Sequence, residues 1–330
     1  MPSAPPATGL IDCQSHIFCP KIIALLEQKT SDPRVYTQDG FRYLPMGGWL
    51  RKILPFYLDI HAKLAAMDAS GVAQAALSIN DPGPEWFGAD GPRVARIMND
   101  FIAGLVHQHP SRFFGLCVLP LQDMPAAIAE LDRCAGELGM KGILLYTNLA
   151  GRFPDEAAFR PLFARAEALG LPVLLHPAMP VTTEIVKDYE MTASLGNMFE
   201  NTIALTRIIM AGMLDEFPKL QLVCPHLGGT LPYIIGRLDH QTRVLKRGPK
   251  YLTKAPSEYL RHVWFDIVSP LPLAIKFVRD FAGPDRLLFA SDHPWVEPAM
   301  ILDCLQRAGL PQAELEKIGS ANARRLFHLD

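Results

Sequence analysis

Short apolar runs alternate along the chain with longer stretches in which apolar residues recur at helical spacing. Most of the short runs are continuously apolar, which is typical of parallel strands covered on both faces. The eight predicted strands are Leu10–Cys13, Ala73–Ile79, Phe114–Leu119, Gly142–Tyr146, Pro172–His176, Leu220–Pro225, Val263–Val268 and Leu287–Ser291. Eight strands separated by helices favour a single-domain (β/α)8 TIM-type barrel, although the count alone also permits a doubly wound open sheet.

Helix stop signals separate several of these strands. The predicted helices are Asp59–Ser70, Pro125–Leu138 and Asp155–Leu169, each followed by a glycine, and Ala193–Phe217, followed by Pro218. Two connections are unusually long: residues 20–56 after the first strand and residues 177–195 after the fifth. In a barrel both rise from the face that carries active sites, so we expect them to shape a pocket. Surface decoration is the alternative.

Composition narrows the class of protein. The chain has 330 residues, is 49% hydrophobic and carries a formal net charge of -2 without a lysine or arginine run, which argues against a nucleic-acid partner. No apolar stretch reaches the roughly 18 residues of a membrane span. We expect residues 1–9 to be a flexible leader and residues 10–330 to form the barrel. The six scattered cysteines form no CxxC pair and predict reduced thiols in a cytoplasmic protein.

Polar residues interrupt the chain where four predicted strands end. His16 closely follows the first strand, His176 ends the fifth, His226 follows the sixth and Asp292 follows the eighth. Because parallel strands of a barrel end on one rim, these four side chains are expected to converge. Imidazole and carboxylate are ligands of zinc-like ions, and a catalytic ion keeps one position open. Taken singly, a residue of this kind at a strand end is more often an ordinary hydrogen-bonding group than a ligand. The joint occurrence of all four predicts a metal-dependent active site.

The same positions carry a family resemblance over nearly the whole chain. The chain resembles the amidohydrolase-superfamily branch that contains aminocarboxymuconate semialdehyde decarboxylase and the resorcylate-type decarboxylases. The resemblance rests on Ile11-Asp12-x-x-x-His16, His176-Pro177, His226-Leu-Gly-Gly-x-x-Pro232-x-x-x-Gly236-Arg237-x-x-His240, Ser291-Asp292-x-Pro294 and Asn322-Ala323-x-x-Leu326-Phe327.

The resemblance implies a role for each matching residue. His16 and His176 match metal ligands, and Asp292 matches a ligand that also holds or shuttles a proton. His226 matches a histidine that does not bind the metal and handles protons. Arg237 matches a substrate-carboxylate contact that can come from a neighbouring subunit, which implies a homodimer. Further substrate contacts are expected from Arg42, a looser match whose alternative is an exposed loop arginine, and from Trp49, as part of an aromatic pocket wall.

Gln14 departs from the family pattern, which has histidine or glutamate two residues before the matching histidine. Gln14 and His16 share strand parity, so both can face the barrel interior. Its carbonyl oxygen is a weaker donor than imidazole or carboxylate. Three outcomes are open: Gln14 is a weak ligand, water replaces it, or the site needs no metal. Asp12 has the same parity and is expected to orient a ligand.

The expected chemistry follows from one metal and a small carboxylate-bearing substrate. No lysine ends the fourth predicted strand, which runs to Tyr146, so one divalent ion is favoured over a bridged pair; zinc is the first choice and manganese the second. Non-oxidative decarboxylation of an unsaturated or aromatic acid is the first prediction. Metal-dependent hydrolysis of a lactone, ester or amide is the alternative, with hydration behind it. A metal-free barrel that binds a small acid is the non-catalytic alternative.

Overall fold

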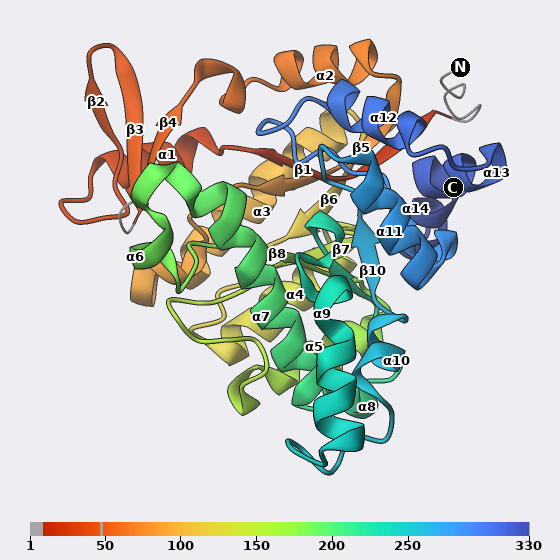
Figure 1. Cartoon of the computed structure of the whole chain (residues 1–330). Helices are drawn as coiled ribbons and strands as arrows, with labels where there is room; N and C mark the ends of the chain where they lie inside the picture. Colours follow the sequence, from red (N-terminus) through yellow and green to blue (C-terminus); the bar gives the residue numbers. More distant parts are fainter. Residues whose placement is uncertain (1–8, 47–48, 330) are drawn as a thin grey trace.

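The computed structural model describes residues 9–46 and 49–329 and contains eight parallel strands in one sheet. The strands are neighbours in the order β1 (Leu10–Ile17), β5 (Val72–Ile79), β6 (Phe113–Cys117), β7 (Gly142–Tyr146), β8 (Val173–His176), β9 (Leu222–Cys224), β10 (Trp264–Asp266) and β11 (Leu287–Leu288). Helices lie around this sheet (Figure 1). The predicted barrel is confirmed, and every predicted strand overlaps an observed one.

Hydrogen bonds between β1 and the segment that follows β11 close the sheet into a barrel. The amide of Cys13 donates to the carbonyl of Phe289 (2.9 Å), and the amide of Asp292 donates to the carbonyl of Gln14 (2.9 Å). Ser15 also forms a parallel bridge with His293. The first strand of the sheet and the segment after its last strand are thus joined beside two predicted metal ligands, His16 and Asp292.

The helices confirm the predicted stop signals, with shifted bounds. The predicted helices correspond to α2 (Ile60–Ala69), α4 (Met124–Gly136), α5 (Arg160–Leu169) and α7 (Asn197–Met210). The last was predicted too long, because Gly212 adopts a left-handed conformation (φ 71°) and separates α7 from α8 (Met213–Glu216). The remaining α-helices are α1 (Pro20–Glu27), α3 (Gly91–Gln108), α6 (Thr183–Val186), α9 (Leu231–Asp239), α10 (Pro256–Leu260), α11 (Pro272–Ala282), α12 (Pro298–Arg307), α13 (Gln312–Glu316) and α14 (Asn322–Phe327).

The long connection after β1 contains regular structure. After α1 it forms an antiparallel sheet of β2 (Tyr36–Gln38), β3 (Phe41–Met46) and β4 (Trp49–Ile53), which extends to one side of the barrel in Figure 1. Alternate residues of β4, namely Arg51 and Ile53, are buried while Leu50 and Lys52 are exposed. One face of β4 is therefore turned toward the barrel.

Two further predictions concern the state of the cysteines and the length of the apolar stretches. All six cysteines are buried free thiols. Among the described residues no helix is both long and apolar enough to cross a membrane. The predicted leader, residues 1–9, lies outside the described residues except for Gly9.

Candidate metal centre and active site

His16, His176 and Asp292 meet at the carboxyl-terminal end of the barrel, as predicted. Their candidate ligand atoms all lie within 4.8 Å of one another. Nε2 of His16 lies 3.1 Å and Nε2 of His176 lies 3.8 Å from the same carboxylate oxygen, Oδ1 of Asp292. Two imidazoles and one carboxylate around one point are a donor set suited to a single divalent ion.

The contacts of His16 leave Nε2 free to bind such an ion. Its Nδ1 lies 2.8 Å from the hydroxyl of Ser78, which itself donates to the carbonyl of Ser15 (3.3 Å). The hydroxyl oxygen therefore accepts from Nδ1–H, and Nε2 carries a lone pair. Burial, helped by the charge of neighbouring groups, lowers the pKa of His16 to about 4, so the ring is neutral at pH 7. A lone pair facing a carboxylate oxygen at 3.1 Å is a contact that a cation stabilises.

His176 also fits a cation. It is 6% exposed, and neither ring nitrogen has a hydrogen-bond partner among the described residues. Its ring packs edge-on against that of His16, with centroids 4.4 Å apart. Burying an imidazole without hydrogen bonds costs free energy that metal coordination would offset. On these observations the residues present fit a divalent ion.

Gln14 lies beside the three donors and hydrogen-bonds one of them. Its amide Nε2 donates to Oδ1 of Asp292 (2.9 Å), and the side chain is 4% exposed. Asp12, one step deeper, accepts hydrogen bonds from the amide and the hydroxyl of Ser291. Asp12 thus fixes the residue immediately before Asp292, which is the orienting role expected of it.

His226 approaches Asp292 from the other side. Its Nε2 lies 3.6 Å from Oδ2 of Asp292, its Nδ1 lies 3.0 Å from Nδ2 of Asn201, and its backbone amide donates to Asp266 (2.7 Å). Burial opposes protonation of this ring, but the hydrogen bond and charge of Asp292 outweigh it and raise the pKa of His226. His226 lies apart from the three donors, in a position that suits proton transfer.

The turn after His226 depends on glycine. Gly229 has a φ of 64°, and a Cβ there would lie 2.3 Å from the carbonyl oxygen of Met198 on α7. Only glycine permits this close approach, which brings α7, and with it Asn201, against the histidine.

Asp292 is held ionised between these histidines. Burial alone would raise its pKa, but contacts with His16, His176 and His226 more than offset burial and hold the pKa well below its ordinary value. The carboxylate presents Oδ1 to the donor cluster and Oδ2 to His226. The carboxylate therefore lies between a candidate metal position and a candidate proton donor.

A cavity of about 420 Å³ opens onto these residues. Both long connections contribute to its lining, as the sequence predicts: Trp49 and Arg51 come from β4, and Ala193 and Ser194 come from the segment before α7, whose first residue, Asn197, also lines the cavity. Other lining residues include Asn80, Asp81, His176, His226, Val268, Asp292, Trp295 and Val296. An apolar cavity with a few convergent polar groups is typical of a small-molecule site.

Arg51 is an arginine of the cavity wall that the sequence does not single out. It is 7% exposed, its guanidinium bonds to Asp81 (2.5 Å), and it stacks near the rings of Trp49 and Trp295, with centroids 4.3 and 4.6 Å away. Its Nε has no hydrogen-bond partner among the described residues. Trp49, Arg51 and Ile53 occupy alternate positions of the chain. If this part of the connection had been predicted as a strand, that alternation would have placed Arg51 on the same face as Trp49.

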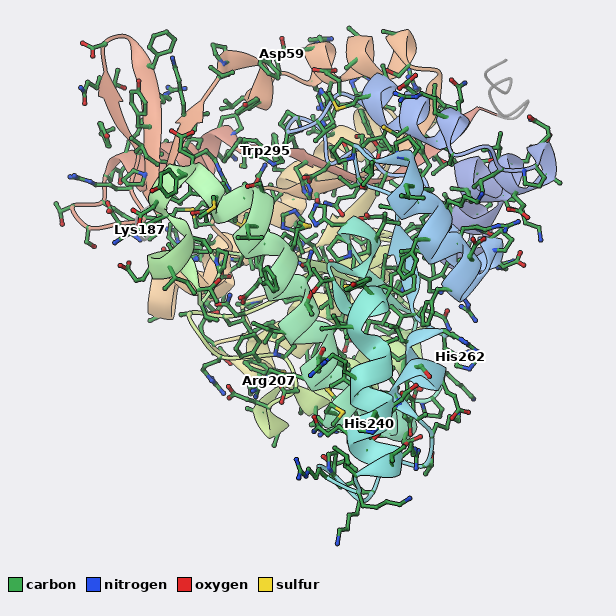
Figure 2. All side chains as sticks on the ribbon, viewed as in Figure 1. Asp59, Lys187, Arg207, His240, His262 and Trp295 are labelled. Carbon is green, nitrogen blue, oxygen red and sulfur yellow. The ribbon has the colours of Figure 1, made fainter. Side chains whose placement is uncertain are left out.

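The other two predicted arginines lie away from the cavity. Arg42 is on β3, and its half-exposed side chain pairs with Glu27 (3.1 Å). Arg237 is exposed on α9, in a surface depression with His240 and Arg247. Figure 2 shows His240 near the tip of the molecule, far from Trp295 of the cavity. The structure of one subunit therefore supports neither Arg42 nor Arg237 as a contact within its own cavity, whereas it places Trp49 there.

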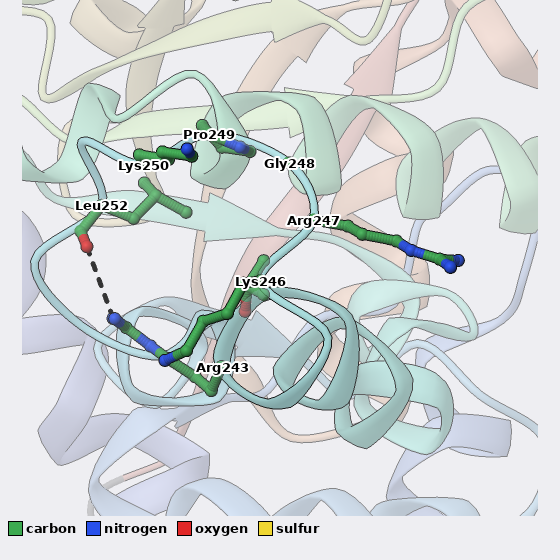
Figure 3. Close-up of a pocket in the computed structure, with 8 residues that line it drawn as sticks. Arg243, Lys246, Arg247, Gly248, Pro249, Lys250 and Leu252 are labelled. Atoms are coloured by element: carbon green, nitrogen blue, oxygen red, sulfur yellow. Dashed lines mark hydrogen bonds between the residues drawn. The ribbon is translucent and has the colours of Figure 1, made fainter.

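A second cavity, of about 350 Å³, lies in the turn after α9. Figure 3 shows that Arg243, Lys246 and Lys250 contribute to its lining, with Arg243 reaching toward the carbonyl of Leu252 (3.5 Å). The described residues that line it supply cations and neither an imidazole nor a carboxylate. The imidazole and carboxylate groups required of the predicted active site line the other cavity, beside Asp292.

Comparisons with known proteins agree with this geometry. The amidohydrolase family matches residues 11–329. Gamma-resorcylate decarboxylase of Rhizobium sp. (strain MTP-10005) is 31% identical over 309 residues, which cover 89% of this chain and 94% of that protein.

Two solved structures share the fold over almost the full length. The crystal structure of 5-carboxyvanillate decarboxylase from Sphingomonas paucimobilis has a TM-score of 0.87 at 27% identity and covers 98% of this chain and 99% of its own. That of dihydroxybenzoic acid decarboxylase from Polaromonas sp. JS666, with bound manganese and the inhibitor 2-nitroresorcinol, has a TM-score of 0.81 at 25% identity and covers 97% of each chain.

Proposed function

We propose that this chain, which belongs to the amidohydrolase family, is a metal-dependent decarboxylase that removes the carboxyl group of a small aromatic acid without an oxidant. The observation that carries the proposal is the position of Asp292 between the donors His16 and His176 on one side and His226 on the other. Decarboxylation was the first of the reactions left open by the sequence, and the relatives named above are decarboxylases. The hydrolytic and metal-free alternatives gain no support from them.

One divalent ion is expected, held by His16, His176 and Asp292. A bound ion would supply a Lewis acid for the carboxylate of the substrate or an oxygen beside it. Gln14 would join the ligands if its amide turned to present Oε1, which gives two nitrogen and two oxygen donors. Oxygen donors suit manganese better than nitrogen donors do, so manganese is a candidate equal to the zinc favoured by the sequence.

The side chains around the ion position supply the proton that decarboxylation requires. The proton goes to the ring carbon that bears the carboxylate, either directly from His226 or through Oδ2 of Asp292. The bond between that carbon and the carboxylate then breaks, and its electron pair returns to the ring as carbon dioxide leaves. The apolar walls of Trp49, Trp295 and Val268 limit access of water to the reacting carbon.

Arg51 is proposed as the arginine that binds the substrate within the subunit. Its charge is held at the cavity wall by Asp81 and the two tryptophans, and its Nε–H is free to donate to a substrate oxygen. A fixed guanidinium orients a carboxylate more strictly than a flexible side chain does.

The assembly is proposed to be a homodimer in which Arg237 approaches the neighbour's site. The surface around Arg237 exposes large apolar side chains, including Tyr233 (82% exposed) and Val244 (65% exposed). Exposed apolar groups of this size beside one another are typical of a surface that another chain covers. We also propose that residues 10–330 form one domain and, from the six free thiols, that the protein works in the reducing cytoplasm.

The direct test is an assay of the purified, manganese- or zinc-loaded protein with 2,6-dihydroxybenzoate and 5-carboxyvanillate. Release of carbon dioxide with formation of the ring product that has lost the carboxyl group is expected for at least one aromatic acid. The same assay with His226→Ala separates enzyme-catalysed from spontaneous release. Hydrolysis of lactones or esters without any decarboxylation would contradict the proposal.

A further inference from the structure

Asn80 is a buried carboxamide at the rim of the barrel. It directly follows β5, the neighbour of β1, and its backbone amide bonds to the carbonyl of Ile17 (3.4 Å). The residue is 2% exposed, yet it contributes to the lining of the cavity that holds His176 and Asp292. The residue is thus fixed at its backbone by the strand pairing and lies in the wall of the cavity.

Neither polar side-chain atom of Asn80 has a hydrogen-bond partner among the residues that the structure describes. The neighbouring side chains of Arg51 and Asp81 bond to each other and not to Asn80. An unbonded, buried amide costs free energy, and native proteins nearly always satisfy such groups. Within the described protein, then, nothing compensates for burying this amide.

Asn148, at the same rim, shows what a structural carboxamide looks like. It is 4% exposed, its Nδ2 donates to the carbonyl of Met179 (3.0 Å) and to Glu200, and its Oδ1 accepts from the amide of Gly151 (3.0 Å). Asn148 therefore holds loops together, whereas Asn80 makes no comparable side-chain contact. The difference indicates that Asn80 is matched to something that enters the cavity.

The chemistry of Asn80 limits what that ligand group can be. The carboxamide offers a donor and an acceptor side by side, in a cavity whose other walls include Trp49, Val268, Trp295 and Val296. A ring hydroxyl next to a carboxylate presents the complement, since the hydroxyl donates and the carboxylate oxygen accepts. A few polar groups placed in an apolar pocket are what fixes orientation and specificity.

We infer that Asn80 determines specificity by hydrogen-bonding a hydroxyl group adjacent to the carboxylate of an aromatic substrate. The inference rests on the proposed function for the substrate class. Within that class, Asn80 favours ortho-hydroxylated acids over acids without the hydroxyl. A site built to hydrogen-bond a substrate hydroxyl discriminates strongly against the analogue that lacks it, because its own polar group is then left unpaired.

The test measures ligand binding by calorimetry to the manganese-loaded protein, with 2-nitroresorcinol and nitrobenzene as a matched pair. Neither compound has a carboxyl group to lose, so the result is independent of turnover and of the proposed reaction. The wild-type protein is expected to prefer 2-nitroresorcinol. Asn80→Leu, which keeps the shape and removes both polar atoms, is expected to lower this preference by about tenfold, the effect of one hydrogen bond. Asn80→Ala provides the same comparison should the leucine variant not fold.

Thermal unfolding of the unliganded variants supplies a second measurement. Asn80→Leu should unfold at or above the wild-type temperature, because no protein hydrogen bond is lost, while the control Asn148→Leu should unfold at a lower one. The inference would be overturned if the wild-type protein did not prefer 2-nitroresorcinol to nitrobenzene. It would also be overturned if a folded Asn80 variant kept the wild-type preference. A loss of stability in Asn80→Leu as large as that in Asn148→Leu would overturn it too.

Discussion

Nε2 of His226 lies 3.6 Å from Oδ2 of Asp292, the carboxylate oxygen that faces away from the cluster of His16 and His176. One carboxylate therefore separates the proposed metal position from the proposed proton donor. This relationship makes the two functions experimentally separable, since each histidine can be changed without removing the other's contact with Asp292.

His176→Ala removes one of the three donors and leaves His226 in place. We expect the variant to lose stoichiometric metal and activity together, because two donors bind a divalent ion much more weakly than three. Elemental analysis of protein purified without chelator measures the metal directly. Gln14→His should retain zinc more tightly than wild type if position 14 is a ligand. Full activity after exhaustive chelation would refute the metal requirement.

His226→Ala should retain its metal and lose turnover. Removal of a general acid–base group lowers kcat by roughly a hundredfold or more. Steady-state kinetics together with metal analysis of the same sample distinguish this result from loss of the ion. Asn201→Leu, which removes the contact at Nδ1 of His226, should show a smaller loss of kcat. Unchanged turnover in His226→Ala would make this histidine structural.

Arg51 and Arg42 can be compared directly, because both are arginines of the connection after β1. Arg51→Gln is expected to raise KM about tenfold or more, since it removes a charged donor from the cavity. Arg42→Gln is expected to change KM little, because Arg42 pairs with Glu27 at the surface. Arg51→Lys should restore charge beside Asp81 and only part of the affinity. A larger effect at Arg42 would reverse the assignment.

Arg237 is tested by mixing inactive subunits. In the proposed dimer, a heterodimer of Arg237→Ala with His176→Ala contains one site with both defects and one site with neither. Each heterodimer should therefore recover up to about half of the wild-type activity, so that a 1:1 mixture reaches roughly a quarter of it after full statistical exchange of subunits. Mass spectrometry verifies the exchange. Verified heterodimers without recovery would place Arg237 outside the neighbour's site.

Glu85 predicts a pH dependence of stability. Burial, reinforced by nearby Asp81, raises the pKa of its carboxyl from 4.5 to about 7. The folded protein then keeps a proton that the unfolded chain releases, so the free energy of unfolding falls as pH rises from about 4.5 to about 7 and changes little beyond. Glu85→Gln should lack this decrease, which is on the order of 2 kcal/mol. Denaturant unfolding across this range measures it, with exposed Glu137→Gln as control; parallel curves for Glu85→Gln and wild type would contradict the prediction.

Much of the barrel and the cluster of His16, His176, His226 and Asp292 follows from the sequence, because buried parallel strands leave continuous apolar runs and polar residues mark their ends. The bounds follow less well. β1 continues four residues beyond its predicted end at Cys13, since its polar residues Gln14, Ser15 and His16 are all buried, and in a buried segment polarity no longer indicates a loop.

The connection after β1 was the least predictable part. Its strands are short and pair with one another, so they lack the long apolar runs of the barrel. Arg51 consequently was not predicted, while Arg42, nine positions earlier, was predicted from its looser match to the family. The choice between the two depends on which face of β3 and β4 meets the barrel, and that is decided by tertiary packing.

The closure of the barrel between β1 and the segment after β11 has a consequence for synthesis of the protein. Gln14 and His16 leave the ribosome early, whereas Asp292, whose carboxylate lies against both of them, follows about 280 residues later. A growing chain therefore holds an incomplete donor set through most of translation, and tight metal capture must wait until the last strand docks against the first. Metal loading thus reports a finished fold.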